Sequence, residues 1–285
     1  MSARRISPPR VNGRAARAPR PPADLPGSSD AYRQTSFVLG EDVALVIEGL
    51  ELEGQHAEAC AGAKYRNRVM AATLGPWSRG WLARLQALHA IEWGDYSSAA
   101  VLVRAAADFE AAALSHLQSG AEEWSGWLDG DGVGEAPDLH AAEFRLHPFR
   151  SAESLARVPA LGEVYREASD FALPHLGATA LLTASDSNRE RYLATFGDRD
   201  FHLGLAELTL GWLLRLGIAH WDRFPGEAPL PAAPEGAAAW CRRAATALAR
   251  RDRCRIERVE REGVERALIV NWRREPRSAM KRILL

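Results

Sequence analysis

Apolar residues recur every three or four positions along most of this chain, from residue 36 to about residue 222. This spacing places apolar side chains on one face of a helix, which must then pack against other helices. Glycines mark the expected breaks, with Gly54 ending the first helix and Gly75-Pro76 separating the second from the third. The pattern predicts an all-α fold, a multi-helix bundle with helices over 37–52, 57–74, 77–93, 95–118, 138–149, 159–171 and 199–221, and a loop with a short helix over 174–198.

The segment 95–118 is the most apolar of these and is predicted to be the inner helix. Its sequence, DYSSAAVLVRAAADFEAAALSHLQ, is apolar on nearly every side, and such a helix must be buried among others. Its alanines let neighbouring helices approach closely, and Asp95 is suited to cap its first turn. We expect it to lie antiparallel to residues 77–93 across a tight turn at Gly94.

Three charged residues interrupt this apolar segment. Arg104 and Asp108 are four positions apart, so we expect them to form an ion pair on one helix face. Glu110 lies in line with Val103 and Leu117 and is expected to be buried, which is costly unless the carboxylate is paired or protonated. Such charges usually cross-link helices, and a polar site inside the bundle is the alternative.

Composition divides the chain into four parts. Residues 1–35 are rich in arginine and proline with few large apolar side chains, which predicts a disordered tail; an arm that contacts nucleic acid or an acidic partner is the alternative. Residues 36–222 form the helical domain, and 223–236 form a proline-rich linker. Residues 237–285 are predicted to contain a helix over 237–251 and then a β-hairpin around Glu262-Gly263, with a helix over 253–272 as the alternative.

Composition and charge also exclude several classes of protein. The 285 residues are 47% hydrophobic and 26% charged, as in ordinary soluble proteins, and a net charge of −1 gives no general attraction to nucleic acid or anionic membranes. The most apolar run, 203–221, is interrupted by Glu207 and Arg215 and is too short to cross a membrane comfortably. Three cysteines without close pairing fit a reducing compartment. We therefore expect a cytoplasmic protein without a membrane span.

Two short runs resemble a known group of proteins. LVRAAADFEAAALSHL, residues 102–117, contains an apolar pair, an arginine, three further residues and an acid. VYREASDFALPHLG, residues 164–177, contains a tyrosine, a serine and a Pro-His pair. Both runs resemble bacterial helical proteins of the broad HEPN group. The resemblance implies a polar site formed by Arg104, Asp108, Tyr165, Ser169 and His175.

Members of this group that cleave RNA use an arginine followed, four to six residues on, by a histidine. The arginine stabilises phosphate charge while the histidine acts as acid or base. This chain has two pairs of that spacing, Arg84 with His89 and Arg215 with His220, both with leucine after the arginine where a polar residue is usual. In a chain so rich in arginine such pairs arise by chance, so the spacing alone does not indicate catalysis.

One set of residues has the spacing of metal ligands. His140, Glu143 and His147 would lie on one face of the helix expected over 138–149. Pro148 follows at once and no fourth ligand can be named, so a solvated helix end is favoured. The sequence has no phosphate-binding glycine loop, nucleophile elbow or paired-cysteine site, and we expect no cofactor.

Two functions are compatible with these patterns. The favoured one is a non-catalytic binding or assembly protein of unknown partner, with self-association through its tryptophan-rich faces as one form. Full burial of Trp77, Trp81, Trp124 and Trp127 in one protomer would remove that assembly surface. The alternative, implied by the HEPN-like resemblance, is an RNA-acting protein such as a ribonuclease toxin or a phage-defence component, and it predicts Arg104 beside Tyr165 or His175 in an open cleft.

Overall fold

The computed structural model describes residues 10–11, 16, 27–61, 67–130, 132–136, 141–185, 187, 190–227 and 229–285. Within these ranges the protein is mostly helical, with two small antiparallel sheets. Most of the tail predicted over 1–35 lies outside them, but its last residues, from Ser28, form the start of a helix. The elements are α1 (Ser28–Val38), α2 (Gly40–Cys60), α3 (Arg68–Glu92), α4 (Tyr96–Gln118), α5 (Glu122–Asp129), β1 (Val133–Ala136), β2 (Ala141–Phe144), α6 (Ala152–Arg157), α7 (Pro159–Ala172), α8 (Leu176–Thr183), α9 (Leu203–Arg223), α10 (Ala237–Leu248), β3 (Arg255–Arg261), β4 (Val264–Trp272) and β5 (Lys281–Leu284).

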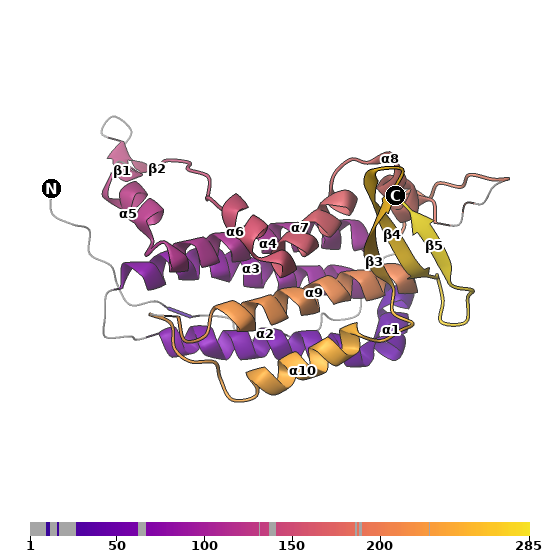
Figure 1. Cartoon of the computed structure of the whole chain (residues 1–285), viewed down its shortest axis with the longest axis horizontal. Coiled ribbons are helices and arrows are strands. Elements are labelled where there is room, and N and C mark those ends of the chain that lie inside the picture. Colours follow the sequence, from indigo (N-terminus) through magenta and orange to yellow (C-terminus); the bar gives the residue numbers. More distant parts are fainter. Residues whose placement is uncertain are drawn as a thin grey trace.

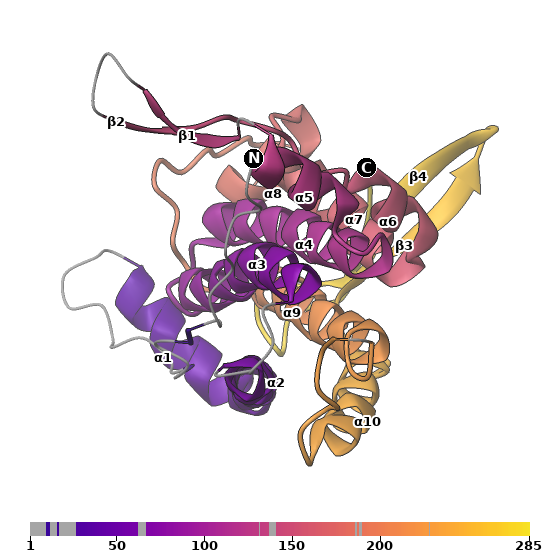
Figure 2. The same ribbon diagram turned by 90° about the vertical axis from the view of Figure 1, so that its left-hand side faces the viewer.

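Helix α4 is the inner helix, as its apolar sequence predicts. It contacts α3, α7 and α9, and the long helices run side by side (Figures 1 and 2). Ala99, Val103 and Ala107 are fully buried along it. Asp95 caps its first turn by accepting a hydrogen bond from the backbone N–H of Ser98 at 3.1 Å. Gly94 makes the preceding turn with φ of 73°, in the region that favours glycine.

Two predicted helix ends are wrong. Helix α2 continues through Gly54 to Cys60, and α3 runs through Gly75 and Pro76 without a break. Residues beyond each expected break are buried, among them His56 in α2 and Trp77 in α3. Tertiary packing of these residues stabilises the helix by more than the local glycine or proline destabilises it.

The helix predicted over 138–149 is also wrong. Strands β1 and β2 pair antiparallel, with Val133 opposite Phe144, and residues 145–150 form an extended segment. The Trp127 indole donates a hydrogen bond to the Arg145 carbonyl at 2.9 Å, and Pro148 has no backbone N–H for a helix. These features leave the segment extended at one end of the molecule, opposite the β3–β5 sheet (Figure 1).

The C-terminal hairpin is confirmed, with one further strand that the sequence pattern did not predict. Strands β3 and β4 pair around Glu262 and Gly263, which have φ of 58° and 74°, as a tight two-residue turn requires. Strand β5 pairs with β4. The sheet is joined to the helices where the Leu203 backbone N–H donates to the Arg274 carbonyl at 2.8 Å.

Candidate functional site

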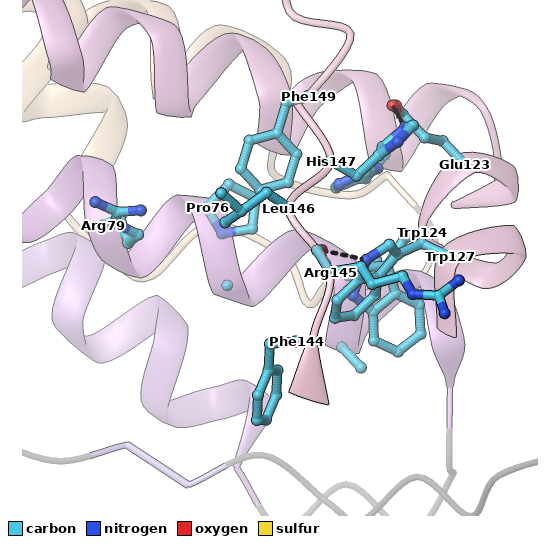
Figure 3. Close-up of a pocket in the computed structure, with 14 residues that line it drawn as sticks. Pro76, Arg79, Glu123, Trp124, Trp127, Phe144, Arg145, Leu146, His147 and Phe149 are labelled. Carbon is cyan, nitrogen blue, oxygen red and sulfur yellow. Dashed lines mark hydrogen bonds and ion pairs between the residues drawn. The ribbon is translucent and has the colours of Figure 1, made fainter. Parts of the chain in front are cut away.

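An apolar cleft of about 390 Å³ lies between α3, the end of α4, α5 and the extended segment after β2 (Figure 3). Ala71 and Gly75 leave room on the α3 side because their side chains are short or absent, and no atom lies within 4 Å of a Cβ built on Gly75. The volume falls in the range of small-molecule sites, about 300–1,000 Å³. The largest apolar side chains in its wall are Trp124, Trp127, Phe144, Leu146 and Phe149.

Three contacts hold the extended segment as the outer wall of this cleft. The first is the hydrogen bond from Trp127 to the Arg145 carbonyl, drawn as a dashed line in Figure 3. His147 Nε2 lies 3.0 Å from Glu123 Oε1, and the Phe149 ring packs edge-on to Phe109 with centroids 6.4 Å apart.

The mouth of the cleft exposes large apolar side chains. Phe144 is 67% exposed and Leu146 is fully exposed. Trp124 and Trp127 are half-buried, whereas Trp77 lies in the core. An apolar patch rimmed by polar residues is typical of an interaction site, and Trp124 and Trp127 belong to this patch.

His116 lies in the wall of the cleft without a hydrogen-bond partner. Its side chain is 2% exposed, and neither ring nitrogen is hydrogen-bonded within the part of the chain that the structure describes. Burial lowers the pKa of His116, against a smaller raising effect of the Glu123 charge, so the ring is neutral at pH 7. A neutral imidazole offers one N–H donor and one acceptor, and a buried group left unpaired costs about 1–3 kcal/mol.

Arg79 supplies a cation at the rim of the cleft. Its guanidinium carbon lies 4.2 Å from the centre of the Phe109 ring, and no carboxylate pairs with it among the described residues. Other charges nearby are already engaged, since Arg145 pairs with Glu143, and Glu123 lies beside His147. Arg79 is therefore available to an anionic group in the cleft.

Arg104 meets Tyr165 and Ser169, as the resemblance implies. Its guanidinium donates to the Tyr165 hydroxyl at 2.8 Å and to Ser169 Oγ at 3.1 Å. The predicted ion pair with Asp108 is wrong, because Asp108 instead accepts a hydrogen bond from Ser151 Oγ at 3.1 Å. His175 is exposed just before α8, and no hydrogen bond or ion pair of the described residues joins it to Arg104.

Glu110 is buried as predicted and belongs to a group of charges shared by four helices. Its Oε1 lies 2.7 Å from His220 Nδ1 on α9. Glu53 on α2 accepts two hydrogen bonds from Arg84 on α3, with both side chains almost fully buried. Burial raises the pKa of Glu53, but the charges of Arg84 and His220 and its hydrogen bonds outweigh this and hold the pKa below its usual value.

One member of each Arg–His pair of ribonuclease-like spacing, Arg84 and His220, belongs to this buried group. Arg84 is bound to Glu53, and His220 to Glu110, while Arg215 pairs with Glu163 and Glu167 on α7. The Arg84–Glu53 and His220–Glu110 contacts each join side chains of two different helices. The group therefore cross-links the helices.

The proposed metal ligands do not share a helix face. His140 lies outside the described residues. Glu143 is in strand β2 and pairs with Arg145, while His147 follows the strand and lies beside Glu123. Among the described residues, no group of three or more histidine, cysteine or acidic side chains is placed to hold a metal ion.

Sequence reasoning missed the cleft and both of its polar groups. The available signals were a lone histidine at position 116 on an apolar helix, and small residues four positions apart on α3, Ala71 and Gly75. Neither pattern indicates which segment of the chain would pack against His116, Ala71 and Gly75. That segment, residues 144–149, falls within the helix that the sequence pattern predicts over 138–149.

Comparison of the chain with protein-family models, curated proteins and solved structures gave no match. Among the described residues, no helix combines the length and apolar character needed to cross a membrane.

Proposed function

We propose that this chain is a non-catalytic binding protein that takes a small, largely apolar molecule into the cleft between α3, α4, α5 and residues 144–149. The observation that carries this proposal is His116, a buried hydrogen-bonding side chain without a partner in the wall of an apolar cleft. A bound molecule that covers the aromatic wall and, by displacing the side chains that enclose the His116 nitrogens, hydrogen-bonds this ring removes two unfavourable contributions to the free energy of the empty site.

The rest of the molecule supports a binding role and a location in the cytoplasm. Arg84, Glu53, Glu110 and His220 bind one another, so these charges serve to hold a helical bundle together. All three cysteines are free, which supports a cytoplasmic location. Self-association through Phe144 and Leu146 is the competing use of the same exposed surface.

Calorimetric titration with 2-naphthol, a small aromatic alcohol, tests this proposal. We expect saturable binding to the wild-type chain and at least tenfold weaker binding to Gly75→Leu, whose new side chain fills the cleft. Leucine favours a helix more than glycine, so the variant should keep its fold. Gly40→Leu on α2 is the matched control, because a Cβ there also meets no atom within 4 Å and lies outside the cleft lining.

Two results would count against the binding role. One is a wild-type chain that takes up no 2-naphthol. The other is self-association of the chain, measured by sedimentation velocity, together with probe binding only after the oligomer dissociates. In that case the exposed Phe144–Leu146 surface serves assembly.

A second candidate function is RNA cleavage, as the HEPN-like resemblance implies. It is supported by the convergence of Arg104 with Tyr165 and Ser169, residues from the two resembling runs. In this case the purified chain cleaves RNA, and an Arg104→Ala variant with unchanged circular dichroism loses that activity. Purified protein that leaves RNA intact would remove this candidate.

A further inference from the structure

We infer that the ligand of the cleft is a two-ring aromatic acid that carries a hydroxyl group at the end opposite its carboxylate. The hydroxyl hydrogen-bonds His116, the rings lie against Phe149 and the two tryptophans of α5, and the carboxylate binds Arg79. This inference rests on the proposed binding function and names the class of molecule that the site selects.

One polar group of the cleft is His116, and the other, Arg79, lies over Phe109 on the same helix as His116. Phe109 and His116 are seven residues apart on α4, so they lie on one face about 10 Å apart along the helix. Arg79 covers the Phe109 ring, which places its guanidinium near that end. A molecule that reaches both groups therefore needs the length of two rings with a substituent at each end.

The wall between these two ends is aromatic. The Phe149 ring packs edge-on to Phe109 at one side and to His116 at the other, with centroids 6.4 Å and 5.5 Å apart. Trp124 and Trp127 project from α5 toward the same space (Figure 3). Flat aromatic rings gain offset or edge-on contacts with such walls beyond the area they bury.

The two ends of the cleft favour different polar groups on the ligand. Glu123 lies near His116, so a ligand carboxylate placed there would meet a like charge and lose its water. A neutral hydroxyl avoids both penalties and can donate to, or accept from, a neutral imidazole. At the other end Arg79 is exposed, cationic and without a carboxylate partner among the described residues, which suits an anion.

Titration of three matched probes against the full chain tests this inference. The probes are 6-hydroxy-2-naphthoate, 2-naphthoate without the hydroxyl, and 2-naphthol without the carboxylate. We expect 6-hydroxy-2-naphthoate to bind tightest, with about tenfold loss on removing either group. In His116→Leu the hydroxyl should no longer increase affinity, while the carboxylate still does. In Arg79→Gln the carboxylate should no longer increase affinity, while the hydroxyl still does.

The outcomes separate this inference from the binding function itself. If 2-naphthol binds as tightly as 6-hydroxy-2-naphthoate, or if Arg79→Gln leaves the carboxylate advantage intact, the inferred ligand class is wrong while the binding function stands. If no probe binds the wild-type chain, both fail. The comparison of probes on the wild-type chain decides the matter even where His116→Leu does not fold.

Discussion

Replacing Arg84 with methionine is expected to destabilise the protein by about 3–5 kcal/mol, because the Glu53 carboxylate then stays buried without its cation. Arg84 and Glu53 have side chains only 3% and 1% exposed, and Arg84 holds Glu53 through both of its terminal nitrogens. Urea unfolding followed by circular dichroism at pH 7 measures the loss.

Two control variants show whether the buried charge causes this effect. In Glu53→Gln/Arg84→Met no unpaired charge remains, so the double variant should be more stable than Arg84→Met alone. Arg243 pairs with Glu48 at the surface, where solvent screens the pair, so Arg243→Met should destabilise the protein far less than Arg84→Met does. An Arg84→Met variant as mildly affected as Arg243→Met would show that Glu53 is solvated or protonated.

Replacing Trp240 with alanine is expected to cost about 3–5 kcal/mol, since it leaves a cavity in a tightly packed contact. Trp240 on α10 is 1% exposed, and its indole donates to the Leu45 carbonyl at 2.7 Å. Its ring lies between Gly49 on α2 and Gly217 on α9, where an added Cβ would come within 2.5 Å of it. Thermal unfolding of the full chain measures the effect.

A glycine substitution tests the same contact from the other side. Gly217→Ala should destabilise the protein, although alanine favours a helix by about 1 kcal/mol over glycine elsewhere. In a Trp240→Ala background the same change should become neutral or stabilising, because the clash is gone. If Gly217→Ala is equally harmful in both backgrounds, the indole does not occupy the space between these helices.

The inner helix and its buried acid could be predicted because their signals are local. Apolar residues on every side of 95–118 require burial, and Asp95 can cap its own helix without help from elsewhere. Gly54 and Pro76 misled the prediction because a local breaker sets only a propensity, and packing of residues beyond it decided the outcome.

The site was harder to predict because it depends on segments distant in sequence. The Arg104–Asp108 spacing allowed an ion pair, but α7 and the segment before α6 supplied other partners. Glu143 and His147 had helical spacing, yet the pairing of β1 with β2 places Glu143 in a strand and His147 in the wall of a cleft. Periodicity within one segment carries no information about such neighbours.

A crystal structure of the full chain with 6-hydroxy-2-naphthoate at saturating concentration tests the central claim most directly. The account predicts the two rings between Phe149 and the α5 tryptophans, the hydroxyl oxygen within hydrogen-bond distance of a His116 ring nitrogen, and the carboxylate against Arg79. A cleft that stays empty at saturation, or a ligand bound elsewhere on the chain, would contradict it.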